Sequence, residues 1–396
     1  MQRCRRFPCV KFEAAHGISK LEYMTGKEEQ ILSAVPAEGR SHPDHSAEQA
    51  PDAAPIEFTG RAGEYFGIWL SNTVLSILTV GIYSAWAKVR RSRYFLGNTI
   101  VLGDRLEYHA TGMTILKGRL IAVAAIAVYF GVGFVSAIGQ TIVAIALVPV
   151  YPWIINRATR FNARMTSWRN VRFDWHGTYW GVARIYLLWP IVAVLTLGLL
   201  APMAARASRE YLANHYALGR ERFGAKTLLR PYYVALLWTL LLGAALLVVV
   251  AGPVAVLFFA SLPSPDGGTG TGMNASLWQL VFVAAPLVVI VPTAICFQIL
   301  TRNIIVSALT LGDVATFRSE LNPLRYLWIV LSNFVVTVLT AFLMHPWAQI
   351  RQYRYQAERI TVRPASGMGT FLDTEARSDQ AFGEEFGEIQ DIGIPI

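Results

Sequence analysis

Residues 70–94 read LSNTVLSILTVGIYSAWAKVRRSRY, and residues 331–355 read LSNFVVTVLTAFLMHPWAQIRQYRY; the two align without a gap and share 11 of 25 positions. Average composition gives about two such matches by chance. A third, weaker copy, LTLGLLAPMAARASREY, occupies residues 195–211. Each copy runs from an apolar segment through Leu-Thr to an arginine-rich helix that ends in Tyr. The repeat therefore predicts architecture, but it indicates no reaction.

The composition around the repeat is that of a membrane protein. Of 396 residues, 54% are hydrophobic and 15% are charged, whereas soluble domains carry about 25% charged residues. Residues 120–137, 234–260 and 277–300 contain no charge at all. Uncharged apolar runs of this length are typical of bilayer spans. We therefore expect a mainly α-helical, polytopic membrane protein.

The net charge of +9 indicates a membrane partner rather than nucleic acid. The basic residues cluster in the loops beside the apolar segments, which is the positive-inside pattern. Such loops attract anionic headgroups by about 1 kcal/mol per Lys or Arg, so we expect contact with anionic phospholipid at the cytoplasmic face. Cys4, Cys9 and Cys296 are too few and too scattered for a disulfide framework or a metal set.

The charge count also predicts a topology. The apolar segments cover roughly residues 66–86, 120–137, 141–155, 183–204, 234–260, 277–300 and 324–348. Linkers 138–140 and 261–276 hold no Lys or Arg, while the other five linkers are basic. The positive-inside rule then predicts four full spans, arranged as two hairpins, with both termini in the cytoplasm.

The three repeat copies would then enter the bilayer and return to the same side. Backbone that turns at membrane depth is tolerated where protein buries it, and the copies hold break points at Gly81, Pro190, Gly198, Pro202 and Pro346. The alternative is seven crossings that violate the charge rule in several loops.

Each basic linker also carries a short hairpin signal. NTIVLGDRLEYHATG, from Asn98, alternates apolar and polar residues around Gly103-Asp104, and a turn dipeptide in such a run favours a β-hairpin. Weaker versions occur at Arg169-Asn170, Gly219-Arg220 and Gly312-Asp313. We expect small hairpins against the cytoplasmic face.

The two ends of the chain differ from the middle. Residues 1–55 are polar, lack apolar periodicity and include Pro36, Pro43, Pro51 and Pro55, so we expect disorder. The basic start lacks an apolar stretch and is no signal peptide, and translation beginning at Met24 is an open alternative. A membrane domain, residues 56–363, follows, with repeat copies near 58–110, 171–224 and 320–363. Residues 364–396 form an acidic tail that is either solvated or docked on the basic linkers.

Several of these motifs together resemble a known family. LTVGIYSAWAKVRRSRYF with the following LGDRLEY, then RNVRFDWHG, then LGDVATFRSEL before a Trp-containing span, resemble the YjgN family of bacterial inner-membrane proteins over residues 57–363. The resemblance implies a multi-pass inner-membrane protein, and the family has no established biochemical function. Its motif usually has Pro before Trp, which Pro346-Trp347 keeps and Ala85 replaces.

Catalytic motifs are absent from the sequence. It holds no H-E-x-x-H, G-x-S-x-G, P-loop or C-x-x-C pattern, so we expect no enzyme, no cofactor and no metal. His109, His176, His215 and His345 are spread over four linkers or span ends, where interfacial polar roles are the simpler interpretation. The predicted spans hold no carboxylate or base, which disfavours a proton-coupled pump.

The candidate functional residues lie in the repeat. Asn72 and Asn333 occupy equivalent apolar positions, as do Thr79, Thr196 and Thr340; they either form helix–helix hydrogen bonds or line a polar path. The arginines of the basic helices fall in pairs spaced by three residues, on one helix face near Trp86 or Trp347. These pairs are Arg90 with Arg93, Arg206 with Arg209, and Arg351 with Arg354. They are either interfacial anchors or phosphate ligands, since Arg presents a planar fork.

These observations favour a passive transporter or lipid-binding protein whose site is lined by the repeat segments. A membrane scaffold that binds a cytoplasmic partner through its linkers and acidic tail is the second hypothesis. A lipid-modifying enzyme is the third, and the missing catalytic motifs disfavour it.

Overall fold

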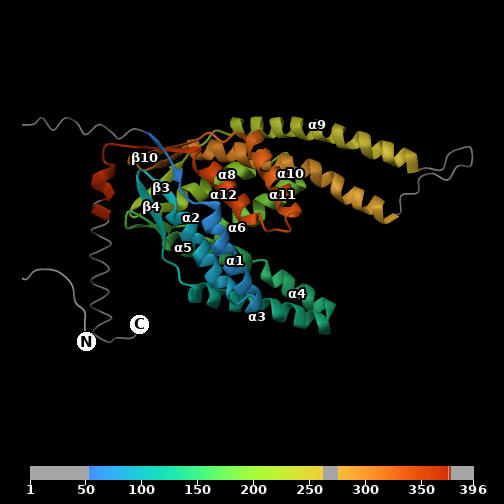
Figure 1. The fold of residues 1–396 in the computed structure, drawn as a ribbon, viewed down its shortest axis with the longest axis horizontal. Coiled ribbons are helices and arrows are strands. Elements are labelled where there is room, and N and C mark those ends of the chain that lie inside the picture. Colours follow the sequence, from blue (N-terminus) through green and yellow to red (C-terminus); the bar gives the residue numbers. More distant parts are fainter. Residues whose placement is uncertain (1–52, 262–274, 373, 376–396) are drawn as a thin grey trace, which may run out of the picture. The chain divides into compact units, whose positions relative to one another are not determined.

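The computed structural model describes residues 53–261, 275–372 and 374–375, and it alternates helices with pairs of strands. The predicted disordered segment and the end of the acidic tail therefore lie outside the described residues, except that Ala54–Pro55 form a strand, β1. In Figure 1 the labelled strands β3 (Thr99–Val101), β4 (Asp104–Tyr108) and β10 (Ala315–Ser319) lie together, and the helices extend away from them.

The eleven strands of the described residues join in one antiparallel sheet. The remaining strands are β2 (Glu57–Phe58), β5 (Thr166–Trp168), β6 (Val171–Trp175), β7 (Tyr216–Leu218), β8 (Glu221–Ala225), β9 (Leu309–Leu311) and β11 (Ile360–Pro364). Their order in space is β1-β11-β10-β9-β8-β7-β6-β5-β4-β3-β2. The two edge strands, β1 and β2, are separated in the chain by Ile56 alone, so the sheet curls round until its edges meet.

The predicted hairpins in the basic linkers are confirmed, while their union in one sheet was not predicted. The turn of the first is Leu102-Gly103, one residue earlier than expected, because both residues have positive φ and Gly103 takes φ +88° without strain. Asn170, at φ +64°, has the same role in the second hairpin. Linker sequence shows each hairpin locally, but pairing between hairpins depends on contacts that are distant in the chain.

The strands alternate between the inside and the outside of the ring. The middle residue of each long strand, such as Leu106, Phe173 or Phe223, packs against the apolar core, and the residue beside it is exposed, as at Arg105 and Arg172. A period of two is what one buried face requires. The core inside the ring contains Trp168, Val171, Leu218, Leu311, Val314, Ala315 and Val362.

The beginning of the acidic tail completes this core. Met368 and Leu372 are buried in it, and Phe371 packs alongside. Glu375 is buried too, 3.9 Å from the Arg220 guanidinium at a hairpin turn. The described part of the tail therefore packs against the sheet, where it covers the core at the end of the ring that carries the hairpin turns.

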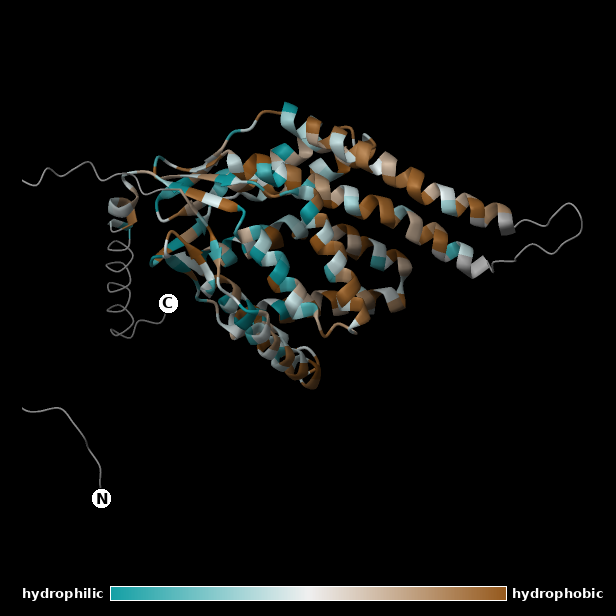
Figure 2. Ribbon diagram, turned by 45° about the horizontal axis from the view of Figure 1, so that its top comes forward, coloured by the Kyte–Doolittle hydropathy of each residue, from teal (hydrophilic) through white to brown (hydrophobic). Residues whose placement is uncertain are grey.

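Five helical segments connect the strand pairs, and two of them are long. Three helices are long and apolar enough to cross a membrane: α3 (Gly112–Val135), α9 (Arg230–Ser261) and α10 (Ala275–Ser307), the last two over 230–256 and 281–307. α4 (Ala137–Leu147) and α5 (Val150–Arg164), bent by 43° at their junction, are long and apolar enough only together, as one broken span or a re-entrant loop. These are the places where four spans were predicted, and Figure 2 shows their apolar middle sections.

The other three segments are short helical hairpins that coincide with the repeat copies. The first is α1 (Ala62–Leu78) with α2 (Ser84–Gly97), and the last is α11 (Pro323–Leu339) with α12 (His345–Ala357). The middle one is α6 (Tyr179–Ala183), a π-helical turn at Arg184–Leu188 and α7 (Trp189–Leu195), followed by α8 (Ala201–His215). Each starts after one strand pair and ends before the next, so both of its ends attach to the ring.

Candidate functional site

The turn of each short hairpin is built on the same threonine. Thr79, Thr196 and Thr340 end α1, α7 and α11. Each hydroxyl donates to the carbonyl oxygen four residues earlier, at 2.7–2.8 Å. It accepts from the backbone N–H four residues later, at 2.9–3.3 Å. These threonines thus satisfy the free backbone groups of a turn whose apolar side chains, such as Val80 and Leu197, are over 90% exposed.

The foot of each short hairpin is closed by the tyrosine that ends the repeat. The Tyr94 hydroxyl accepts from the N–H of Arg61 at 2.8 Å and donates to its carbonyl at 2.9 Å. Tyr211 does the same with Thr178, and Tyr355 with Asn322. Each partner is the residue that precedes the first helix of that hairpin. The shared tyrosine therefore holds the two ends of the hairpin together.

The residue before each tyrosine ties the hairpin to the next strand pair. Arg93 donates to the Ala110 carbonyl at 3.1 Å, and Arg354 donates to the Gly60 carbonyl at 2.7 Å. Each of those carbonyls lies two residues beyond a strand. These two arginines therefore position backbone, which leaves less of each guanidinium free for a ligand.

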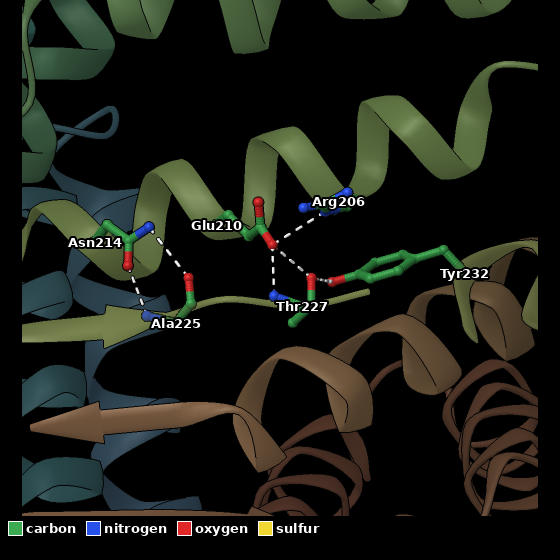
Figure 3. A network of polar contacts seen from close by, with 6 residues as sticks. All are labelled: Arg206, Glu210, Asn214, Ala225, Thr227 and Tyr232. Carbon is green, nitrogen blue, oxygen red and sulfur yellow. Dashed lines mark hydrogen bonds and ion pairs between the residues drawn. The ribbon is translucent and has the colours of Figure 1, made fainter. Parts of the chain in front are cut away.

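In the middle copy, the residue before the tyrosine is acidic rather than basic. Glu210 accepts from the N–H and the hydroxyl of Thr227, both at 2.7 Å, and from Arg206 at 3.1 Å (Figure 3). Thr227 also lies two residues beyond a strand, so an acceptor here replaces the donor of the other copies. Burial alone raises the pKa of Glu210, but the bonds from Thr227 and Arg206 outweigh it and lower that pKa overall.

The asparagines of the first and last copies receive hydrogen bonds from arginines within the same hairpin. Arg90 Nη1 donates to Asn72 Oδ1 at 3.3 Å, and Arg351 Nη1 donates to Asn333 Oδ1 at 3.0 Å. Asn333 also donates to the Ala348 carbonyl at 3.0 Å. Both asparagines are buried. Each pair thus links the apolar first helix of the hairpin to its basic second helix.

The remaining candidates are placed separately. The Trp86 ring packs directly over Gly112, where a Cβ atom would lie 2.4 Å from the ring. Arg351 lies over the Trp347 ring, 5.2 Å from its centroid. In the middle copy, Arg209 Nη2 donates to the Gln298 carbonyl on α10 at 3.1 Å.

The repeat copies meet in a groove between α2 and α12, which we call the α2–α12 groove. Two adjoining cavities of about 630 and 510 Å³ form it and share Lys88, Arg91 and Gln349 as lining. Lys88 and Gln349 occupy the same repeat position, as do Arg91 and Gln352. The groove therefore lies where equivalent faces of the first and last copies approach, and the first copy supplies its positive charge.

The groove is basic, and its lining contains no acid among the residues that the structure describes. Besides Lys88 and Arg91 it is lined by Arg119, from α3, and by His345. Asp and Glu do not occur among the residues that line its two cavities. Arg119 donates to the Ser84 hydroxyl, which fixes the guanidinium near the turn end of α2. Such a set of cations without a counter-ion favours an anionic ligand.

A hydrogen-bonded chain orients the polar wall opposite the cations. Tyr65 donates to Gln349 Oε1 at 2.9 Å, and Gln349 Nε2 lies 2.5 Å from His345 Nε2. Burial, and then the charge of Arg91, lower the pKa of His345. At neutral pH the histidine is therefore uncharged, and Lys88, Arg91 and Arg119 supply the charge of the groove.

A third cavity, of about 510 Å³ between α11 and α12, contains more of the sequence-predicted arginines but is less suited to an anion. Trp347, Arg351 and Arg354 line it together with Glu358. Glu358 lies 3.9 Å from Arg354, and Arg351 is already bonded to Asn333. These two cations are therefore partly compensated by protein groups, and the third arginine of the lining, Arg325, lies over the Tyr355 ring, 5.6 Å from its centroid.

Of the residues predicted from the sequence, Asn72 alone lines the α2–α12 groove. Lys88, Arg91 and Arg119 were missed, although one signal was available: Lys88 and Arg91 are the charged residues of the first copy that the last copy replaces with glutamine. In the part of the chain that the structure describes, no three His, Cys, Asp or Glu side chains group as a metal site would.

Comparison with known proteins places this chain beside bacterial membrane proteins. A family model described as a bacterial protein of unknown function (DUF898) matches residues 53–389. The inner membrane protein YjgN of Salmonella typhimurium is 25% identical over 360 residues, which cover 78% of this chain and 88% of that protein. YjgN of Escherichia coli O157:H7 is 28% identical over 145 residues, or 36% of each chain. No solved structure matches.

Proposed function

Because this chain belongs to the DUF898 family of bacterial proteins, whose function is unknown, we propose a function from its geometry: it is a non-enzymatic protein of the inner membrane that binds anionic phospholipid in the α2–α12 groove. The location follows the printed name of its relatives and the long apolar helices. The observation that supports the ligand is the set of three cations without an acid, Lys88, Arg91 and Arg119.

The topology that goes with this function has the sheet on the cytoplasmic side. The outer face of the ring carries exposed arginines, as the positive-inside rule requires of cytoplasmic segments. α1, with 17 residues, is about 25 Å long at 1.5 Å per residue, which is short of the roughly 30 Å hydrocarbon core. The three short hairpins would then enter the bilayer and return, with their turns satisfied by Thr79, Thr196 and Thr340.

An anionic headgroup fits this groove for electrostatic reasons. Unpaired cations beside the hydrocarbon region are costly, and they mark functional sites when they face a cavity. A phosphate diester supplies acceptor oxygens for the Arg91 and Arg119 guanidinium groups and a counter-charge for Lys88. The apolar ends of the same groove, at Ile77 and Trp69, provide contacts for acyl chains.

Binding is better supported than transport through the ring. The inside of the ring is filled by the apolar core, which includes Trp168 and Leu218, and Met368 and Leu372 of the tail cover it. A polar solute has no open route past these side chains. The α2–α12 groove lies outside the ring, among helices, where lipid reaches it laterally.

The test is the lipid that remains bound to the gently extracted protein, identified by native mass spectrometry. We expect wild type to retain phosphatidylglycerol in preference to phosphatidylethanolamine. The triple variant Lys88→Gln, Arg91→Gln, Arg119→Gln should lose most of it, because each cation contributes about 1 kcal/mol or more to headgroup attraction.

The matched control removes the same charge from the outer face of the sheet, with Arg105→Gln, Arg172→Gln and Arg222→Gln. This variant should retain phosphatidylglycerol like wild type, and gel filtration of both variants checks their folding. Equal retention by the groove variant and wild type, or equal loss in the two variants, would remove the groove as the lipid site.

A further inference from the structure

A second basic cavity lies where three helices reach the ring, and we call it the ring cavity. Its volume is about 580 Å³, within the range of small-molecule pockets. The ends of α5, α8 and α10 form one side, and the strands β4, β6 and β8 form the other. It shares no lining residue with the α2–α12 groove.

Two arginines, Arg209 from α8 and Arg302 from α10, line the ring cavity. Arg209 Nη2 donates a hydrogen bond to the Gln298 carbonyl at 3.1 Å. Arg302 Nη1 is buried and makes no hydrogen bond within the described residues. Since acidic side chains are missing from the lining that the structure describes, no acid in that lining compensates these two positive charges.

An unpaired buried guanidinium nitrogen needs a physical explanation. Buried polar side-chain atoms nearly always have a partner, and an uncompensated buried charge costs several kcal/mol. Burial, which outweighs the opposing effect of Tyr232, and the charge of Arg302 lower the pKa of Arg209, so Arg302 adds to the cost of the buried Arg209 charge. Nothing in the folded protein offsets the cost of burying the Arg209 and Arg302 charges together. A bound anion between the two guanidinium groups would offset it.

The other residues that line the ring cavity indicate the chemistry of the rest of the ligand. Phe173 and Phe223 are stacked with ring centroids 6.3 Å apart, and Leu106 lies in the same lining. These three side chains also pack against the core inside the ring, so the cavity ends there. An inorganic ion would leave this apolar surface uncovered, whereas a ligand with an apolar or aromatic body covers it.

We propose that the ring cavity binds an organic phosphate, whose phosphate group is held by Arg209 and Arg302 and whose apolar body lies against Phe173 and Phe223. Arginine suits this role because its planar fork donates two parallel hydrogen bonds to phosphate oxygens. The phosphate belongs either to a lipid headgroup or to a soluble small molecule, and the same two arginines recognise both. This site is separate from the proposed lipid groove and does not depend on it.

Binding to the full-length protein in nanodiscs of neutral lipid, measured by calorimetry, tests the site. The probes are 1-naphthyl phosphate as the soluble form, dihexanoyl phosphatidic acid as the lipid form, and inorganic phosphate as the bare anion. We expect at least one organic probe to bind about tenfold or more tightly than inorganic phosphate, and the tighter one identifies the source. Equal binding of all three probes, or none, overturns the proposal.

The variants separate this site from the groove. Arg302→Gln should weaken the preferred probe by about tenfold or more, as expected for loss of a charged hydrogen-bond donor. Arg209→Lys, which keeps the charge but loses the fork, should weaken it too. The groove variant Lys88→Gln, Arg91→Gln, Arg119→Gln should bind it like wild type. Loss of binding in the groove variant alone places the ligand in the groove and contradicts the proposal.

The unfolding temperature of the ligand-free protein distinguishes a ligand-binding role of Arg302 from a structural role, because the two predict opposite changes. Arg302→Met removes an unpaired buried charge and keeps an apolar stem, so it should raise the unfolding temperature without ligand. The same variant should lose the stabilisation that the preferred probe gives wild type. If Arg302→Met unfolds at a lower temperature than wild type, Arg302 supports the fold and the proposed ligand role fails.

Discussion

The first and last short hairpins differ from the middle one at the positions that carry charge. The first and last link their two helices through Asn72 with Arg90 and Asn333 with Arg351. The middle copy has Trp189 and Ala207 at the corresponding positions, and Trp189 Nε1 is buried without a partner in the described structure. The turn threonine and the foot tyrosine, in contrast, are common to all three.

This difference separates structural from functional demands. Features present in all three copies satisfy backbone groups at the turn and the foot, which every hairpin needs. Features that vary decide what lies beside the hairpin: the first copy supplies Lys88 and Arg91 to the groove, and the middle copy supplies Arg209 to the ring cavity. The exchange of arginine for Glu210 keeps the tie to the next strand pair while changing the local charge.

The largest expected effect comes from breaking the asparagine–arginine pair. Asn333→Leu leaves Arg351 and the Ala348 carbonyl without their buried partner, and it should lower the free energy of unfolding in detergent by about 3 kcal/mol. Trp189→Phe, at the corresponding position of the middle copy, should change it by less than about 1 kcal/mol, since its N–H has no partner to lose. Equal effects would erase the distinction between the copies.

A smaller effect is expected from Glu210. Glu210→Ala removes the acceptor of the Thr227 N–H and hydroxyl, and it should cost about 2 kcal/mol of unfolding free energy. The pKa of Glu210 is lowered from its ordinary value of 4.5, so its charge stabilises the fold fully above that pH. The stabilisation is lost as pH falls through the lower folded value.

The matched variant for this pH dependence is Glu210→Gln, which keeps an acceptor but not the charge. The gap in unfolding free energy between wild type and Glu210→Gln should therefore be constant near neutral pH and close in acid. A gap that stays constant down to pH about 3 would show that the charge of Glu210 does not stabilise the fold.

The shared turn should respond alike in all copies. Thr79→Val, Thr196→Val and Thr340→Val each keep the shape of the side chain but remove the hydroxyl that serves two backbone groups. Each should lower the free energy of unfolding by about 1 kcal/mol, measured in the same detergent. One copy that loses nothing while the others do would mean that its turn is solvated differently.

The smallest effect concerns the pH dependence of lipid binding. Since the pKa of His345 is lowered, the histidine is neutral at pH 7 and gains a proton in acid, which adds a positive charge to the groove. Retention of phosphatidylglycerol should therefore rise in acid, at a pH below the ordinary pKa of histidine. His345→Gln should remove that rise, and an unchanged pH profile in this variant would exclude His345 as its source.

Much of the fold was predictable because its signals are local in the sequence. The apolar helices, which give three candidate spans and a fourth if the bent pair is one span, the short hairpins of the basic linkers and the special turns of the repeats follow from periodicity, turn residues and charge count. The ring of strands was not predictable, since β1 pairs with β11 through Ala54 and Val362, at opposite ends of the membrane domain, and each hairpin is too short to indicate its neighbour. The closure depends on five residues, 54–58, that the sequence placed at the edge of a disordered segment.

The residues that line the proposed sites are not the ones that the sequence singled out, for a physical reason. The sequence drew attention to residues that recur, and recurrence marks structural roles: Arg93 and Arg354 bind backbone, and the threonines satisfy turns. The groove and the ring cavity are built from residues that do not recur, such as Arg119 and Arg302. The role of such residues depends on the side chains that lie opposite them, and only the tertiary structure shows which side chains those are.

The most direct measurement is an experimental structure of the protein in nanodiscs that contain phosphatidylglycerol and phosphatidylethanolamine. We expect density for a phosphodiester within hydrogen-bonding distance of Lys88, Arg91 and Arg119, with acyl chains leaving toward the bilayer. That density should be missing from the triple glutamine variant. A groove filled by protein side chains or by water alone in the presence of phosphatidylglycerol would contradict the proposed lipid site.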